Sequence, residues 1–204
     1  KQWLSAALDA PQEITADADL FRTFQRHRLR LLDGELLSDA GLARIEADAL
    51  AGKSVLVTSN RVDRAQAIYA ALRARLHSAD VALALLHGRF NLRERAAKER
   101  LIREAAGSDS NTRRPLILVA TQVVEVSLDI DLDTIYSDPA PLEALIQRFG
   151  RVNRRRQQSD LAPVHVFREP NDGQKVYDAL LVQRTLAVLE RIQDQAIAES
   201  AVST

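Results

Sequence analysis

The sequence contains no cysteine and no methionine, and only four histidines among its 204 residues. Without cysteine the chain has no disulfide framework, no thiol nucleophile and none of the usual structural zinc sites. The histidines stand at positions 27, 77, 87 and 165, a spacing that does not suit a shared metal ion. We therefore expect a cytoplasmic protein without a metal site of its own.

Aromatic residues and long hydrophobic runs are also scarce. The chain has one tryptophan, three tyrosines and five phenylalanines, so base stacking should contribute less to any nucleic-acid binding than phosphate contacts do. No apolar run approaches the roughly 20 residues that a membrane-spanning helix needs, which predicts no membrane partner. The 28 basic and 28 acidic residues balance, so a charged site must come from local clustering.

From residue 40 onward, short apolar runs alternate with longer segments in which apolar residues recur every three to four positions. This alternation predicts repeated β-α-β units and hence an α/β fold with a parallel sheet. Asn60 follows the first run and can cap the next helix. The expected strands are 54–59, 81–86, 116–120, 134–138 and 164–167, and the expected helices run from Asn60 to Leu76 and over 91–106, 142–149 and 175–198.

The two ends of the chain differ from its middle. In the stretch RHRLRLLDGELLS, Asp33 and Gly34 stand between apolar segments, which is typical of a hairpin turn. We interpret residues 1–40 as a connector or edge hairpin from a missing N-terminal portion, residues 41–170 as the main domain and residues 171–204 as a C-terminal helix. The missing methionine favours a piece of a longer polypeptide.

The stretch AGKS at 51–54 resembles the end of a phosphate-binding loop, but Ala47 stands where that pattern needs its first glycine. Such a loop also follows a strand and precedes a helix, whereas here the order is reversed. We interpret Gly52 as a helix stop and Lys53 as a surface charge. Without this loop, the chain cannot bind a nucleoside triphosphate in the usual way alone.

The stretch QRFGRVNR at 147–154 holds three arginines, and two more follow with no acidic residue among them. It fits Q-x-x-G-R-x-x-R, in which Gly150 permits a turn and Arg151 and Arg154 stand three apart. Such guanidiniums can bind the outer phosphoryl group of a nucleotide held by another domain. The alternative is a solvated basic turn. The preceding ATQVVEVSLDID disfavours it, because ligands bind where parallel strands end.

The segments VATQVVEVSLDID and DPAPLEALIQRFGRVNR resemble motifs V and VI of superfamily 2 helicases, specifically the helicase part of the CRISPR-associated helicase-nuclease of type I interference systems. SVLVTSNRVDRAQAIYAAL and LLHGRFNLRER resemble motif IV and the segment after it. The resemblance covers about residues 50–156. It implies the second RecA-like motor domain of that enzyme, with three layers formed by a parallel sheet and helices on both of its faces.

The resemblance also implies roles at the nucleotide. Gln147, Arg151 and Arg154 match the motif VI residues that face the ATP phosphates and the attacking water from the second domain. Gly150 belongs to the same motif. Asp129 matches the motif V acid near the nucleotide, and a capping or loop-stabilising role is its alternative.

Five residues are expected to contact nucleic acid. Thr121 matches the motif V hydroxyl that contacts the backbone, and Gln122 beside it carries a polar group suited to a phosphate or sugar. Ser59 and Asn60 correspond to motif IV at the strand-binding rim. Arg89 lies in the segment after motif IV, where it could instead anchor a loop. The alternatives for Thr121 and Asn60 are a strand-end hydroxyl and a helix cap.

The sequence lacks Walker A and Walker B motifs and the His-Asp pair expected of the family's nuclease domain. The resemblance therefore implies that ATP and Mg²⁺ are bound mainly by a first RecA-like domain of the parent chain. It also implies single-stranded DNA, a nuclease domain and a CRISPR surveillance complex as partners. We expect this chain to be inactive alone, and Arg148 and Arg155 to face solvent or DNA phosphate.

Two other functions stay open. One is an RNA or repair helicase domain of the same superfamily, which the SLDIDLDTIYSDPAP context disfavours. The other is a non-catalytic binding module that kept the fold and lost the reaction.

Overall fold

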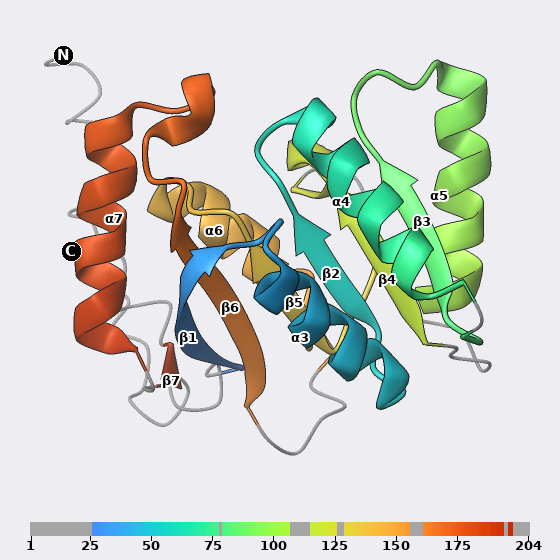
Figure 1. Ribbon diagram of the computed structural model, residues 1–204, viewed down its shortest axis with the longest axis horizontal. Helices are drawn as coiled ribbons and strands as arrows, with labels where there is room; N and C mark the ends of the chain where they lie inside the picture. Colours follow the sequence, from blue (N-terminus) through green and yellow to red (C-terminus); the bar gives the residue numbers. More distant parts are fainter. Residues whose placement is uncertain are drawn as a thin grey trace, which may run out of the picture.

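The computed structural model describes residues 26–77, 79–106, 115–125, 129–155, 161–193 and 196–197. Within these ranges the chain forms one sheet with the strand order β3-β4-β2-β5-β6-β1-β7 (Figure 1). Six strands are parallel to their neighbours, and β7 pairs antiparallel to β1 at the edge. The predicted α/β fold with a parallel sheet is confirmed.

The strands are β1 (His27–Glu35), β2 (Val55–Thr58), β3 (Ala82–Leu86), β4 (Leu116–Ala120), β5 (Thr134–Ser137), β6 (Ala162–Glu169) and β7 (Ala196–Ile197). The α-helices are α3 (Asp39–Leu50), α4 (Val62–Arg75), α5 (Leu92–Ala106), α6 (Leu142–Phe149) and α7 (Ala179–Ile192). Two short 3-10 helices, η1 (Gln122–Val124) and η2 (Gly173–Lys175), follow β4 and β6. All five strands expected from the apolar runs are present.

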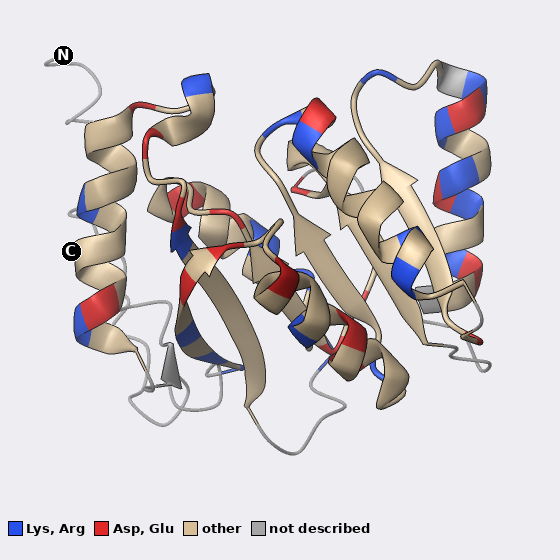
Figure 2. Cartoon of the chain, viewed as in Figure 1, with Lys and Arg blue, Asp and Glu red and all other residues tan. Residues whose placement is uncertain are grey.

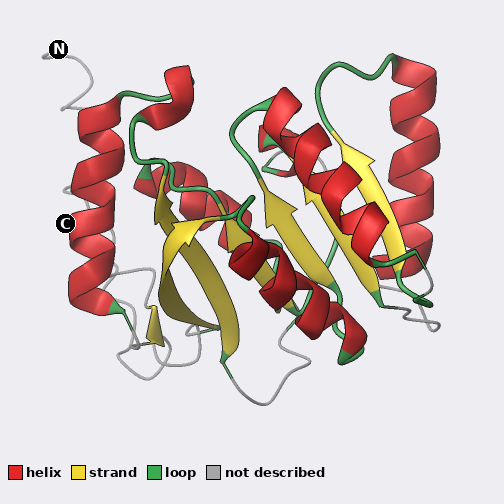
Figure 3. Ribbon diagram, viewed as in Figure 1, coloured by secondary structure: helices red, strands yellow, loops and turns green. Residues whose placement is uncertain are grey.

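Helices cover both faces of the sheet (Figures 1 and 3). On one face, Val55 and Val57 of β2 pack in a cluster with α3 and α4. Leu56 between them points to the other face and packs in a cluster with α5, α6 and α7. Because successive strand residues point to opposite faces, a strand covered on both sides is apolar throughout, as VLVT and LILVA nearly are.

Charged residues lie mainly on the helices and loops, and the central strands carry few of them (Figure 2). Among the described residues, no helix is both long and apolar enough to cross a membrane.

The hairpin predicted at Asp33 and Gly34 does not form. Residues 27–35 are instead the single strand β1, which pairs parallel to β6, with a register irregularity between Leu32 and Glu35. Gly34 has φ +80, a backbone conformation that allows a local bulge within a strand that continues past it. The first 25 residues lie outside the described ranges, and the division of the chain at residues 40 and 170 stays a prediction.

The helix expected over 175–198 is shorter than predicted: α7 begins after its N-cap, Asp178, and ends at Ile192, and residues 196–197 form β7. The other helix boundaries follow local signals with one exception. Pro141 stands at the start of α6, as expected, and Gly52 with φ +89 follows the end of α3. The exception is α4, whose N-cap is Arg61 rather than Asn60. The Asn60 side chain faces inward, where it donates to the Pro139 carbonyl at 2.8 Å. Asn60 therefore ties two strand ends together instead of capping a helix.

Candidate functional site

The loop that follows α6, residues 150–155, is here called the arginine loop. It is anchored to the segment before β5 by the Leu132 amide, which donates to the Arg151 carbonyl, and by the Asn153 amide, which donates to the Leu132 carbonyl. The Asp131 carboxylate accepts from the amides of Arg154 at 2.8 Å and Arg155 at 3.2 Å. The motif V segment therefore holds the motif VI backbone in place.

The two arginines predicted to act on a phosphate lie on this loop, and Asp129, from the segment before β5, lies beside them. Arg154 Nη1 is 2.6 Å from Asp129 Oδ1, in a pair that is largely exposed. Arg151 Nη2 donates to the carbonyl of Glu125 at 2.7 Å. Burial lowers the pKa of the Arg151 guanidinium, and the positive charge of Arg154 lowers this pKa further, against an opposing effect of Asp129. Asp129 thus lies where it balances two like charges.

Gln147 and Gly150 precede these arginines in the chain. The Gln147 side chain is exposed on α6, one residue before the buried Arg148. Gly150 ends α6 with φ −59, which any residue can adopt, so this turn does not depend on a glycine's conformational freedom. The residue with left-handed backbone is Asn153, with φ +46, and asparagine tolerates this conformation better than most residues. The turn is therefore specified at Asn153.

The arginine loop lies at the amino end of the sheet. Its Val152 carbonyl contacts His27 Nε2 at the start of β1, at 2.8 Å, and its partner Leu132 lies two residues before β5 begins. We expected the chemistry where the parallel strands end. The short α6 instead carries the chain from the carboxyl end of β5 back to the start of β6, and motif VI is displaced with it.

The predicted nucleic-acid residues do lie where strands end, and we call Ser59, Asn60, Thr121, Gln122 and Arg89 the carboxyl-end cluster. Ser59, Asn60 and Thr121 are buried, Gln122 is half-buried and Arg89 is exposed. Gln122 Nε2 donates to the Asn60 carbonyl at 2.9 Å, which joins the ends of β4 and β2.

The buried carboxylate of Asp138, which follows β5, organises this cluster. It accepts from Ser59 Oγ at 2.7 Å and from the Asn60 amide at 3.3 Å, and it pairs with Arg64 Nε at 3.3 Å. A fully buried carboxylate requires such donors, because an unpaired charge inside a protein is very costly. Sequence reasoning missed Asp138. The sequence feature that could have identified it is an acidic residue immediately after an apolar strand.

Arg148 is the largest fully buried side chain of the described residues, which corrects our expectation that it faces solvent or DNA phosphate. Its guanidinium donates to four residues: Glu125 at 2.9 Å, Ser137 at 3.0 Å, Asn60 at 3.0 Å and Tyr177 at 3.3 Å. The fork geometry of arginine lets one side chain reach partners in several directions.

Helical spacing could have identified Arg148. Leu145, Arg148 and Phe149 recur at i, i+3 and i+4 and are the buried residues of α6, so Arg148 lies on the apolar face. Arg148 also connects the two ends of the site. It contacts Asn60 in the carboxyl-end cluster, and it binds the carboxylate of Glu125, whose carbonyl accepts from Arg151.

The described residues contain no group of three or more His, Cys, Asp or Glu side chains that could hold a metal ion. The donor set at the arginine loop is instead cationic, and it suits an anion.

A family model for the C-terminal part of the CRISPR-associated nuclease/helicase Cas3 matches residues 51–157, more than half of the chain. The matched range includes the carboxyl-end cluster, Asp129 and the arginine loop.

Individual relatives agree with this match. The CRISPR-associated endonuclease/helicase Cas3 of Escherichia coli K12 is 41% identical over 113 residues, which cover 55% of this chain and 13% of that protein. The crystal structure of T. fusca Cas3 with AMPPNP is similar with a TM-score of 0.78 and 27% identity, over 87% of this chain and 22% of that one.

A chain in a structure described as a CRISPR RNA-guided surveillance complex, pre-nicking, has a TM-score of 0.69 and 28% identity, over 87% of this chain and 24% of that one. This chain therefore spans less than a quarter of the length of each of these proteins.

Proposed function

We propose a function from one premise: the chain belongs to the family of C-terminal domains of the CRISPR-associated nuclease/helicase Cas3. It is the second motor domain of an ATP-dependent helicase that moves along single-stranded DNA in CRISPR interference. The observation that carries this proposal is that Arg151 and Arg154 lie on one anchored loop beside Asp129, inside the range that the family model matches.

In this proposal, Arg151 and Arg154 complete an ATP site whose phosphate loop lies in a first RecA-like domain of the parent chain. Two guanidiniums three residues apart donate hydrogen bonds to the charge that develops on the transferred phosphoryl group. Arg154 exchanges the exposed carboxylate of Asp129 for the phosphate, and Asp129 holds the guanidinium in reach until then. Gln147, exposed on α6 beside them, orients the attacking water.

The described residues fit an ATP phosphate better than they fit Mg²⁺. Arg151 donates to the carbonyl of Glu125, a neutral acceptor, and Arg154 is 43% exposed, so the loop offers positive charge to an anion. Mg²⁺ prefers carboxylate and water oxygens, and we assign its ligands to the first RecA-like domain. When bound, the ion neutralises charge on the phosphates. On this reading the present chain does not hydrolyse ATP alone.

The carboxyl-end cluster forms the nucleic-acid side of the domain. Thr121, Ser59 and Asn60 are buried and fixed among the strand ends, so they shape this edge, over which the sugar-phosphate chain passes. Gln122 and the exposed Arg89 supply side-chain contacts to phosphates. Contacts of this kind are independent of base sequence, as a translocating motor requires.

The partners that we propose follow from the same family. The chain docks against the first RecA-like domain of its parent protein, which also carries a nuclease domain, and the parent acts with a CRISPR surveillance complex. The similarity to a chain of such a complex supports this assignment.

Steady-state ATP hydrolysis tests the proposal. It would be measured for this chain alone and for the full parent protein, each with no nucleic acid, single-stranded DNA or single-stranded RNA. We expect the parent protein to hydrolyse ATP and this chain alone not to, and we expect DNA to accelerate hydrolysis more than RNA does. Stronger stimulation by RNA would favour an RNA helicase. A parent protein with no ATP hydrolysis would leave a non-catalytic binding module as the better account.

A further inference from the structure

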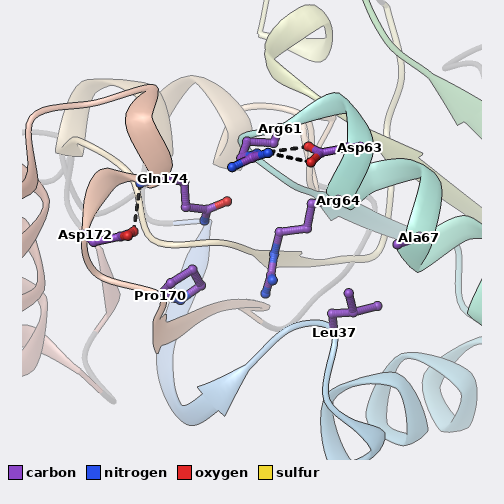
Figure 4. Close-up of a pocket in the computed structure, with 8 residues that line it drawn as sticks. All are labelled: Leu37, Arg61, Asp63, Arg64, Ala67, Pro170, Asp172 and Gln174. Carbon is purple, nitrogen blue, oxygen red and sulfur yellow. Dashed lines mark hydrogen bonds and ion pairs between the residues drawn. The ribbon is translucent and has the colours of Figure 1, made fainter.

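A cavity opens at the carboxyl end of the sheet, beside the carboxyl-end cluster but outside it. Its volume is about 410 Å³, and it lies between the start of α4, the end of β6 and η2 (Figure 4). Its lining residues are Leu37, Arg61, Asp63, Arg64, Ala67, Pro170, Asp172 and Gln174. None of these residues has a role in the proposed ATP site.

Gln174 is the unusual member of this lining. It is 94% buried, and its backbone is held in the left-handed region, with φ +54. Its backbone N–H donates to Asp172 Oδ1 at 2.9 Å. The side chain points into the space between Arg61, Arg64 and Pro170 (Figure 4). Neither Nε2 nor Oε1 has a hydrogen-bond partner within the described part of the chain. A buried side-chain carboxamide without hydrogen-bond partners is costly and rare, so Gln174 is fixed in a position that suits a ligand.

The charges of the cavity argue against a free phosphate as that ligand. Arg61 is bound by both oxygens of Asp63, at 2.9 and 2.5 Å. Arg64 is bound by Glu35 at 3.0 Å and by Asp138 at 3.3 Å. Each guanidinium is thus neutralised by carboxylates, and Asp172 adds a further negative charge. The cavity suits a neutral group that offers one hydrogen-bond donor and one acceptor to the carboxamide of Gln174.

Its walls suit a flat group. The ring of Pro170 lies on one side, the guanidinium of Arg64 lies on another, and Leu37 and Ala67 add apolar surface (Figure 4). Guanidinium planes and apolar surfaces are common stacking partners of unpaired bases. Each nucleobase carries a donor and an acceptor on its edges, and glutamine pairs in bidentate fashion with adenine.

We propose that this cavity receives one unstacked nucleobase of the single strand, held at its edge by the carboxamide of Gln174. This inference rests on the proposed function, because the strand must cross the carboxyl end of the sheet to reach the cavity. The base enters as the strand passes Asn60, the residue immediately before Arg61. The carboxamide accepts any base and favours adenine modestly.

Binding of two strands by the full parent protein tests the inference. The probes are a 12-nucleotide deoxyadenosine strand and a 12-nucleotide abasic strand with the same sugar-phosphate backbone, each dye-labelled and titrated without divalent cations so that the strand is not cut. Gln174→Met keeps the length of the side chain but removes the donor and the acceptor. We expect it to weaken binding of the deoxyadenosine strand by about fivefold or more and to leave the abasic strand unaffected.

Two further variants sharpen the test. Gln183→Met changes an exposed glutamine of α7 and should alter neither affinity. Gln174→Glu keeps the shape and the acceptor but loses the donor, so it should lose part of the base-dependent affinity even if Gln174→Met folds poorly.

DNA-stimulated ATP hydrolysis by the wild-type parent separates two kinds of failure. If DNA stimulates hydrolysis and both Gln174 variants bind the deoxyadenosine strand as tightly as wild type, the cavity holds water or polypeptide, and the base-binding inference is overturned while the motor function stands. If the wild-type parent neither binds the strands nor responds to DNA, the proposed function itself fails.

Discussion

Replacing Arg148 by alanine should cause a large loss of stability. The change removes a guanidinium that is fully buried and leaves the carboxylate of Glu125, itself 12% exposed, without its 2.9 Å partner. It also removes the donors to Asn60 and Ser137, which are both buried. Breaking a buried pair on one side typically costs about 3–5 kcal/mol, out of a total of roughly 5–15 kcal/mol for a domain.

Urea unfolding followed by circular dichroism measures this loss as a change in the free energy of unfolding. The matched control is Arg100→Ala, because Arg100 pairs with Glu104 at 3.8 Å and both side chains are mostly exposed. The control should change stability by no more than about 1 kcal/mol. Arg148→Lys should lie between wild type and alanine, since the charge stays and part of the fork is lost. Equal, small losses for Arg148→Ala and Arg100→Ala would refute the role of Arg148 as a buried connector.

Two other predictions concern stability. Burial lowers the pKa of His165 below its ordinary 6.5. The unfolded state therefore binds the proton first, and the free energy of unfolding should fall as the pH drops from 7 to 5. His165→Phe should flatten this dependence, and an unchanged slope would contradict the prediction. Gly41→Ala should destabilise the chain by about 1–3 kcal/mol in thermal melts, because a Cβ there would lie 2.6 Å from the Leu36 carbonyl oxygen. Gly150→Ala should cost less, because a Cβ at that position would lie 3.3 Å from its nearest neighbour. The reverse order of the two losses would contradict the close approach of β1 and α3.

The sheet could be predicted from the sequence because buried parallel strands leave a plain apolar signal. LILVA and VLVT are both buried from end to end, and each was expected as a strand. The hairpin prediction failed because Asp-Gly marks a backbone with positive φ without specifying whether the chain turns or only bulges. Gly34 takes that φ inside β1, where pairing with β6 continues on both sides of it.

Motif matching assigned Asp129 and Arg154 to one nucleotide site; the structure brings them within 2.6 Å of each other, and their roles there stay predictions. Motif matching could not give the location of the arginine loop at the amino end of the sheet, because that depends on the direction in which α6 crosses. Nor did it find Gln174, whose significance comes from burial without a partner, a property of packing that no local pattern encodes. Arg148 was misjudged because its charge was weighed before its position on the apolar face of α6.

The central claim is that Arg151 and Arg154 act on ATP held by another domain, and ATP turnover by the full parent protein with saturating single-stranded DNA tests it most directly. Arg151→Ala and Arg154→Ala should each lower turnover by ~10³-fold or more while the KM for ATP changes less, because these contacts form with transition-state charge. Arg184→Ala, at an exposed arginine of α7, should retain wild-type turnover. Wild-type turnover in both loop variants would contradict the account.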